Sequence, residues 1–137
     1  MYRRRFLAGA GITVLPLFTG CLGDSGTAIR LCYLGINNEM EAESVEAEFR
    51  VREGESTIAE GAEEIEPSGY VDLNDYRPTE PGQYVVELRI TDTEWEALDT
   101  SAFDADQVAV EGRIERRSDD ETPILAIFRS LNPHACE

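Results

Sequence analysis

Carboxylates crowd one stretch of the chain, residues 92–106, where they could bind a cation. Asp99, Asp104 and Asp106 are the candidate metal ligands, and the last two share the alternate spacing that calcium-binding loops use. Calcium takes about six to eight oxygen ligands, which a flexible acidic segment can supply. The glycine and terminal glutamate of an EF-hand loop are missing here. The stretch is therefore either a calcium site of another kind or a solvated acidic loop.

The chain holds three cysteines and one histidine, His134. A blue-copper site needs a second histidine, and structural zinc normally takes four Cys or His ligands, so neither site is expected within one subunit. His134 and Cys136 are expected in a polar C-terminal tail. Cys32 and Cys136 are candidates for a disulfide, whose loop of about a hundred residues would contribute about 4.7 kcal/mol in the chain-entropy treatment. The alternative for Cys32 is a buried thiol.

The residues needed for catalysis are sparse. A Ser-His-acid triad would have to use His134, four residues from the C-terminus as given, and no serine lies in a Gly-x-Ser-x-Gly turn. Carboxylate pairs are abundant, but none has an apolar sequence setting that would raise the pKa of one member. We therefore expect no catalytic residues, no cofactor and no enzyme activity.

Aromatic side chains are the remaining candidates for a contact surface: Trp95, Tyr70, Tyr76 and Tyr84. Tyr84 shares its strand phase with Val86 and is expected to face the core. Trp95 lies among acidic residues, where it either covers an edge of the fold or stands exposed as a contact residue.

The overall composition is strongly acidic. The chain has 28 Asp and Glu residues against 12 basic ones, all of them arginine, and its formal net charge is −16. Such a surface repels itself, but molar salt shortens the Debye length to about 3 Å and screens the repulsion. The acidic, lysine-free composition resembles that of haloarchaeal proteins. The charge also argues against nucleic-acid binding, which requires a basic surface.

The N-terminus reads as an export signal. Arg3, Arg4 and Arg5 precede Phe6 and Leu7, and a mostly apolar stretch of signal-peptide length, too short to span a bilayer, runs to residue 18. The Arg-Arg-x-Phe-Leu core resembles the twin-arginine export signal, with Tyr2 and Ala8 departing from its fuller pattern.

The segment Phe18-Thr19-Gly20-Cys21 resembles a lipobox. This resemblance implies cleavage before Cys21 and a two-chain lipid on its sulfur, which anchors stably where one chain does not. We therefore expect a signal peptide at residues 1–20, a lipidated Cys21 with a tether to residue 28, and a folded domain at residues 29–137. The expected location is the outer face of the cell membrane, with membrane lipid as one partner.

The remaining chain is dominated by period-two alternation of apolar and polar residues, which is typical of half-buried strands. The expected strands cover 29–36, which is apolar in both phases, then 45–52, 57–65 in two pieces, 70–73, 84–91, 108–114 and 124–128. Asn37 and Asn38 are expected to form a turn or a break, residues 92–106 a long acidic connection with a helical turn near Trp95, and Gly112 a bulge.

These strands predict an all-β fold, a small antiparallel β-sandwich of about seven strands, immunoglobulin-like or related. The run from Glu80 to Val86 resembles a late strand of immunoglobulin-like surface domains, in which Pro-Gly-x-Tyr opens the strand. A sandwich hosts many functions. We therefore expect a non-catalytic, membrane-anchored binding or accessory module of the cell envelope, with a possible protein partner in a membrane complex. The alternative is an ion- or small-ligand-binding lipoprotein.

Overall fold

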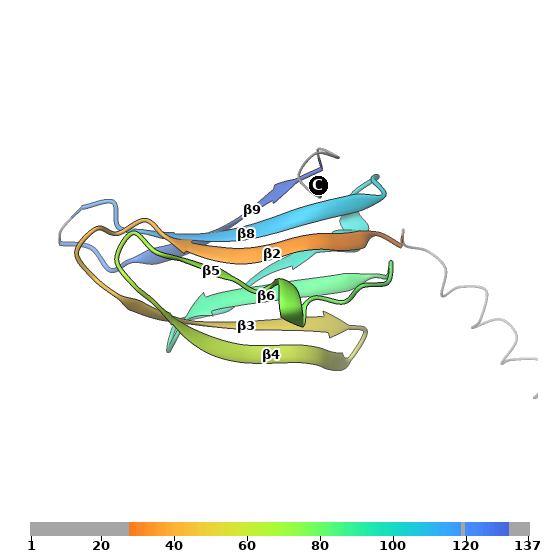
Figure 1. The fold of residues 1–137 in the computed structure, drawn as a ribbon, viewed down its shortest axis with the longest axis horizontal. Helices are drawn as coiled ribbons and strands as arrows, with labels where there is room; N and C mark the ends of the chain where they lie inside the picture. The colour runs from red at the N-terminus through yellow and green to blue at the C-terminus, as the bar shows by residue number, and fades with distance from the viewer. Residues whose placement is uncertain (1–27, 119, 132–137) are drawn as a thin grey trace, which may run out of the picture.

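The computed structural model describes residues 28–118 and 120–131, which form two packed β-sheets (Figure 1). Two short 3-10 helices, η1 (Asn74–Tyr76) and η2 (Thr100–Ala102), lie in the connections. The strands are β2 (Arg30–Asn38), β3 (Val45–Glu53), β4 (Ser56–Ile65), β5 (Tyr70–Asp72), β6 (Tyr84–Ile90), β7 (Glu96–Asp99), β8 (Gln107–Glu115) and β9 (Ile124–Ser130).

Each sheet contains four strands. One has the order β5-β2-β8-β9 and the other β4-β3-β6-β7, and Figure 1 shows the first above the second. The predicted β-sandwich is therefore confirmed, with eight strands in place of about seven. One pairing differs from the antiparallel expectation: β2 runs parallel to β8, from Arg30 beside Gln107 to Asn38 beside Ile114. Hairpin reasoning missed this pair because its two strands are distant in sequence.

The core lies between the sheets and follows the period-two pattern. In β3, Ala47, Phe49 and Val51 are buried, whereas Glu48 and Arg50 between them point outward. Strand β2 is buried over most of its length, as its two apolar phases predict, with a bulge after Leu31. Burying these side chains supplies the main favourable term in folding.

A buried tyrosine fixes the start of β6. The Tyr84 hydroxyl donates to the carbonyl oxygen of Glu80 at 2.6 Å, and 2% of Tyr84 is exposed, which confirms that it faces the core. A tyrosine hydroxyl bonded in this way to the backbone a few residues upstream also occurs in immunoglobulin-like sandwiches. Thr100, also buried, accepts from the Tyr84 backbone N–H at 3.0 Å with its hydroxyl oxygen. The Pro-Gly-x-Tyr segment is therefore anchored from both sides.

Three local predictions need correction in part or in full. Residues 37 and 38 form no turn, although the strand does break off at Asn38, whose buried side-chain amide donates to carbonyl oxygens of Glu43, Ile65 and Glu66. The 92–106 connection contains edge strand β7 and helix η2. Gly112 keeps the regular β8 register, and a Cβ there would approach Leu88 Cδ1 to 2.7 Å. Close sheet packing, and not a bulge, therefore requires this glycine.

Candidate functional site

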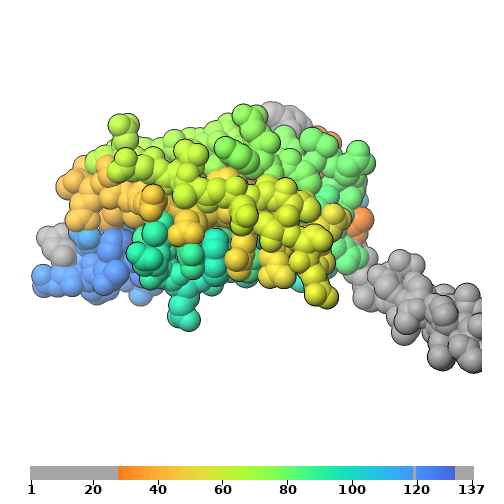
Figure 2. Space-filling view, turned by 90° about the horizontal axis from the view of Figure 1, so that it is seen from below, coloured from red at the N-terminus to blue at the C-terminus, as the bar shows by residue number. Residues whose placement is uncertain are grey.

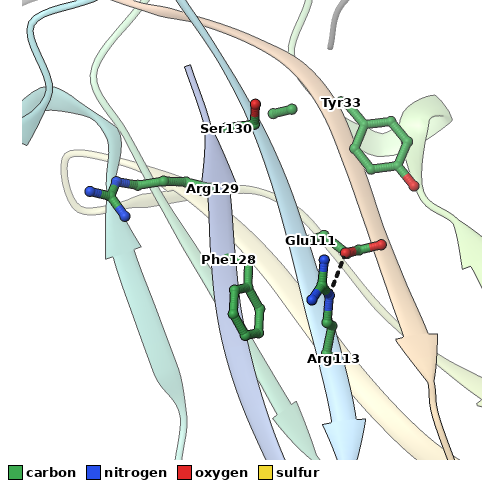
Figure 3. A pocket seen from close by; sticks show the side chains of 7 residues that line it. Tyr33, Glu111, Arg113, Phe128, Arg129 and Ser130 are labelled. Atoms are coloured by element: carbon green, nitrogen blue, oxygen red, sulfur yellow. Dashed lines mark hydrogen bonds and ion pairs between the residues drawn. The ribbon is translucent and has the colours of Figure 1, made fainter. Parts of the chain in front are cut away.

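The outer face of the β5-β2-β8-β9 sheet carries a groove of about 320 Å³. Tyr33 of β2 lies on one side of it and Phe128 of β9 on the other, with Glu111 and Arg113 of β8 between them (Figure 3). Strand pairing explains the hollow, because Ala109, which is small, stands beside Tyr33 on the neighbouring strand. We call these five residues the aromatic groove.

A charged pair forms the polar part of the aromatic groove. Arg113 Nε donates to Glu111 Oε1 at 2.8 Å, and the two residues point to the same side because they alternate along β8 (Figure 3). The guanidinium carbon of Arg113 also lies 4.4 Å from the centre of the Phe128 ring. The guanidinium group of Arg113 is therefore held by a carboxylate and by an aromatic face.

A second aromatic pair extends the groove toward β5. The rings of Tyr33 and Tyr70 are nearly parallel, at 7°, with centres 6.4 Å apart. Gly35 lies between them, and a Cβ at this position would come within 2.6 Å of both hydroxyl oxygens. Partial burial, and then the charges of Asp72 and Glu111, raise the pKa of Tyr70 above its usual value of 10.0. Tyr70 thus presents a neutral hydroxyl.

Exposed apolar side chains gather on this face. Six large apolar residues are exposed in the described part of the chain, and Tyr70, Ile124 and Phe128 among them belong to the outer face of this sheet. Phe128 is 45% exposed although a neighbouring guanidinium covers part of its ring. Gathered exposed apolar side chains mark interaction sites more often than isolated ones do.

The opposite outer face, on β4-β3-β6-β7, holds Trp95. Guanidinium carbons of Arg50 and Arg89 each lie 4.2 Å from the Trp95 ring, so that the ring is in contact with two cations. Arg50 pairs with Glu87 and Arg89 with Glu48 across β3 and β6. Trp95 is therefore partly buried against the sheet, which differs from the exposed alternative. Figure 2 views this layer from below. The yellow β3–β4 hairpin lies toward the right, and the blue-green segment near β7 lies at the lower centre.

The predicted calcium ligands do not converge. Asp99 accepts hydrogen bonds from the backbone N–H and the hydroxyl of Ser101, at 2.9 and 2.7 Å, and caps η2. Asp104 and Asp106 are exposed. Within residues 28–118 and 120–131, no group of three or more Asp, Glu, His or Cys side chains could hold a metal ion. Calcium binding stays a prediction.

Several predicted residues lie outside the described part of the chain: Arg3, Arg4, Phe6, Leu7, Cys21, His134 and Cys136. Cys32 is disulfide-bonded, and its sulfur lies 3.4 Å from the carbonyl oxygen of Val108. The bonded state corrects the alternative of a free buried thiol. The pairing with Cys136 stays a prediction.

Sequence reasoning missed the aromatic groove. It named Tyr70, which stacks beside Tyr33, but none of the five groove residues as a site residue. Tyr33 shares an apolar phase with Ile29 and Leu31, but the bulge after Leu31 shifts the alternation and turns Tyr33 outward. The available signal was the alternation around Val108 and Val110, which places Glu111 and Arg113 on one outward face.

Among residues 28–118 and 120–131, no helix has the length and apolar character needed to cross a bilayer. Comparison of the chain with known proteins finds no matching family model, no similar curated protein and no similar solved structure.

Proposed function

We propose that this protein is a non-catalytic binding module of the cell envelope, held at the outer face of the membrane by lipid on Cys21. The aromatic groove is its contact surface. The observation that carries the proposal is the gathering of Tyr33, Tyr70 and Phe128 beside an ordered ion pair on one sheet face. Ligand sites combine apolar and aromatic lining with a few placed polar groups in this way.

The groove favours binding over catalysis. Glu111 is the one carboxylate among its lining residues, and Arg113 is bonded to it. Acid–base hydrolysis of most substrates needs two groups in separate protonation states. A single ion-paired carboxylate between aromatic rings is better suited to orienting a ligand than to transferring a proton.

The N-terminal motifs support the location. The twin-arginine pattern at Arg3 and Arg4 and the lipobox ending at Cys21 stand in the order that export and lipidation require. Ile29 begins the sandwich by bridging to Gly82, so a tether of a few residues would join the lipid to the domain. We infer an outward-facing domain close to the membrane surface.

Envelope binding tests the contact surface. Full-length protein, kept in detergent micelles and molar salt, is sedimented with detergent-extracted envelopes from cells that lack it. We expect binding by wild type and by Ile58→Ala, whose residue on β4 is about as exposed as Phe128. Phe128→Ala should lose most of it. Equal binding by both variants would contradict the assigned surface.

Mass spectrometry of the N-terminal peptide tests the anchor separately. Cleavage before a lipid-modified Cys21 is the expected result, since two acyl chains are needed for stable attachment. An intact peptide that begins at Met1 would overturn the lipoprotein assignment without affecting the aromatic groove.

A further inference from the structure

The aromatic groove offers apolar surface and paired polar groups in one small space. Tyr33 lies beside Ala109 and Phe128 beside Glu111, so the two aromatic residues flank β8 and are two residues out of register. Their side chains border a groove of about 320 Å³, with the Glu111–Arg113 pair beneath it (Figure 3). This volume accommodates one ring of a small molecule.

We propose that the aromatic groove binds a neutral sugar ring, as part of a glycan, against Phe128 and Tyr33. The inference rests on the proposed function and names its ligand class. A pyranose presents a face of C–H groups and a rim of hydroxyls. The C–H face contacts an aromatic ring, whose π-cloud attracts the positive edges of C–H bonds. The hydroxyls meet the polar groups.

The Glu111–Arg113 pair matches the hydroxyl rim. A hydroxyl both donates and accepts, so two neighbouring hydroxyls can accept from Arg113 and donate to Glu111. The pair is already ordered, because Arg113 contacts both Glu111 and the Phe128 ring. Binding therefore does not have to immobilise a free arginine side chain, which lowers its entropic cost.

Other ligand classes fit less well. An acyl chain would bury the Glu111–Arg113 pair without hydrogen-bonding it, which is unfavourable. A small cation on the Phe128 ring would be repelled by the positive charge of Arg113, whereas a neutral ring can contact the exposed part of Phe128 without that repulsion. A peptide that adds a strand to the sheet would use the backbone edge of β9 and not the face that carries the groove. A proline-rich peptide, which docks on aromatic-lined grooves, is distinguished from a glycan by the protease arm of the test. An anion would find Arg113 already paired with Glu111, and concentrated salt would screen its attraction to the guanidinium.

The effect of concentrated salt on recognition favours the same ligand class. Charge-driven recognition weakens in concentrated salt because screening shortens the range of electrostatic attraction. Apolar stacking does not depend on that attraction, and excluded salts strengthen it. A neutral sugar held by aromatic rings is therefore recognised at the salt concentrations that the acidic composition indicates.

Periodate treatment of the envelopes tests the ligand class, because periodate cleaves the vicinal diols of sugars. Full-length protein is sedimented with detergent-extracted envelopes that were treated with periodate and reduced, treated with protease, or left untreated. We expect periodate to abolish the binding that depends on Phe128. Binding that survives periodate would overturn the glycan assignment, and its loss after protease alone would identify a protein partner.

Variants keep this test specific to the groove. Phe128→Ala should weaken binding about tenfold or more, as loss of a central aromatic contact does. Phe128→Tyr retains the ring and should restore most of it. Ile58→Ala is the control of matched exposure on the other sheet. Equal loss in Ile58→Ala, or no rescue by Phe128→Tyr, would contradict stacking on this ring.

The two proposals fail in different ways. If binding depends on Phe128 but survives periodate, the aromatic groove remains the contact surface and the glycan assignment is wrong. If binding is lost after periodate but does not depend on Phe128, the sugar is bound elsewhere and both proposals for this groove fall. Binding that needs both Phe128 and intact diols supports both.

Discussion

The two outer faces of the sandwich use the same kinds of residue in different ways. On the β4-β3-β6-β7 sheet, Trp95 contacts both Arg50 and Arg89, and both arginines are paired with glutamates. On the other sheet, a single arginine, Arg113, contacts one face of Phe128, and much of that ring stays exposed. One face covers much of its aromatic ring with groups of the chain, and the other leaves aromatic surface exposed.

The comparison shows that exposure, and not residue type, separates a structural aromatic cluster from a candidate binding site. Both faces combine aromatic rings, arginine and glutamate. The Trp95 cluster takes its cations from two neighbouring strands, β3 and β6, and both guanidinium groups contact the ring. The aromatic groove lies beside small residues such as Ala109, so space remains above the ion pair.

Trp95→Ala should have the largest effect on stability. The change removes two cation–π contacts and the cover over the Glu87 and Glu48 pairs, so we expect the free energy of unfolding to fall by about 2 kcal/mol. Phe128→Ala should cost about 1 kcal/mol or less, because that ring is already largely exposed. Urea unfolding in constant molar salt measures both. A larger loss for Phe128→Ala would reverse the comparison.

Acid should loosen the Trp95 face first. The hydrogen bond from Arg89, which outweighs burial, holds the pKa of Glu48 below its usual value of 4.5. Because the folded chain binds this proton more weakly than the unfolded chain does, the stabilisation is present above pH 4.5 and is lost as the pH falls below it.

We expect Trp95 emission to change in that acidic range, as protonation of Glu48 releases Arg89 from its pairing. Glu48→Gln cannot titrate and should remove this step while leaving global unfolding cooperative. An acid transition in Trp95 emission that is identical in Glu48→Gln would show that another group is responsible.

The Tyr33–Tyr70 stack should respond at the alkaline end. The pKa of Tyr70 is raised, chiefly by burial, so the folded chain holds this proton more tightly and stability declines as the pH rises above about 10. Gly35→Ala places a methyl group where both hydroxyls now lie. We expect the variant to separate the rings and return the pKa of Tyr70 toward its usual value. Absorbance titration of tyrosinate measures this, and an unchanged titration would contradict the packing.

Changes in the acidic loop should have the smallest effect. Asp104→Asn and Asp106→Asn alter exposed side chains, so stability should change by no more than about 0.5 kcal/mol. Thermal melts with and without added calcium in molar salt provide the measurement. A calcium-dependent rise in the melting temperature that both substitutions abolish would instead establish the calcium site.

Particular residues show why some features could be predicted and others could not. The alternation in 45–52 and 84–91 gave β3 and β6 because burial on one face imposes a period of two. Strand β7 could not be predicted because an edge strand buries little: three of its four residues are exposed and two are acidic. The burial of Asn38 could not be predicted either, because it depends on three carbonyl groups that other segments supply.

The sequence by itself determined that this chain forms short, half-buried strands and a tyrosine-anchored β6, since these depend on local alternation and on a contact four residues away. Only the tertiary structure decided which outward residues meet. Phe128 stands beside Glu111, and Trp95 contacts both Arg50 and Arg89, because of strand register and sheet order. Alternation sets the face of a residue, but its neighbours on that face come from strands distant in sequence.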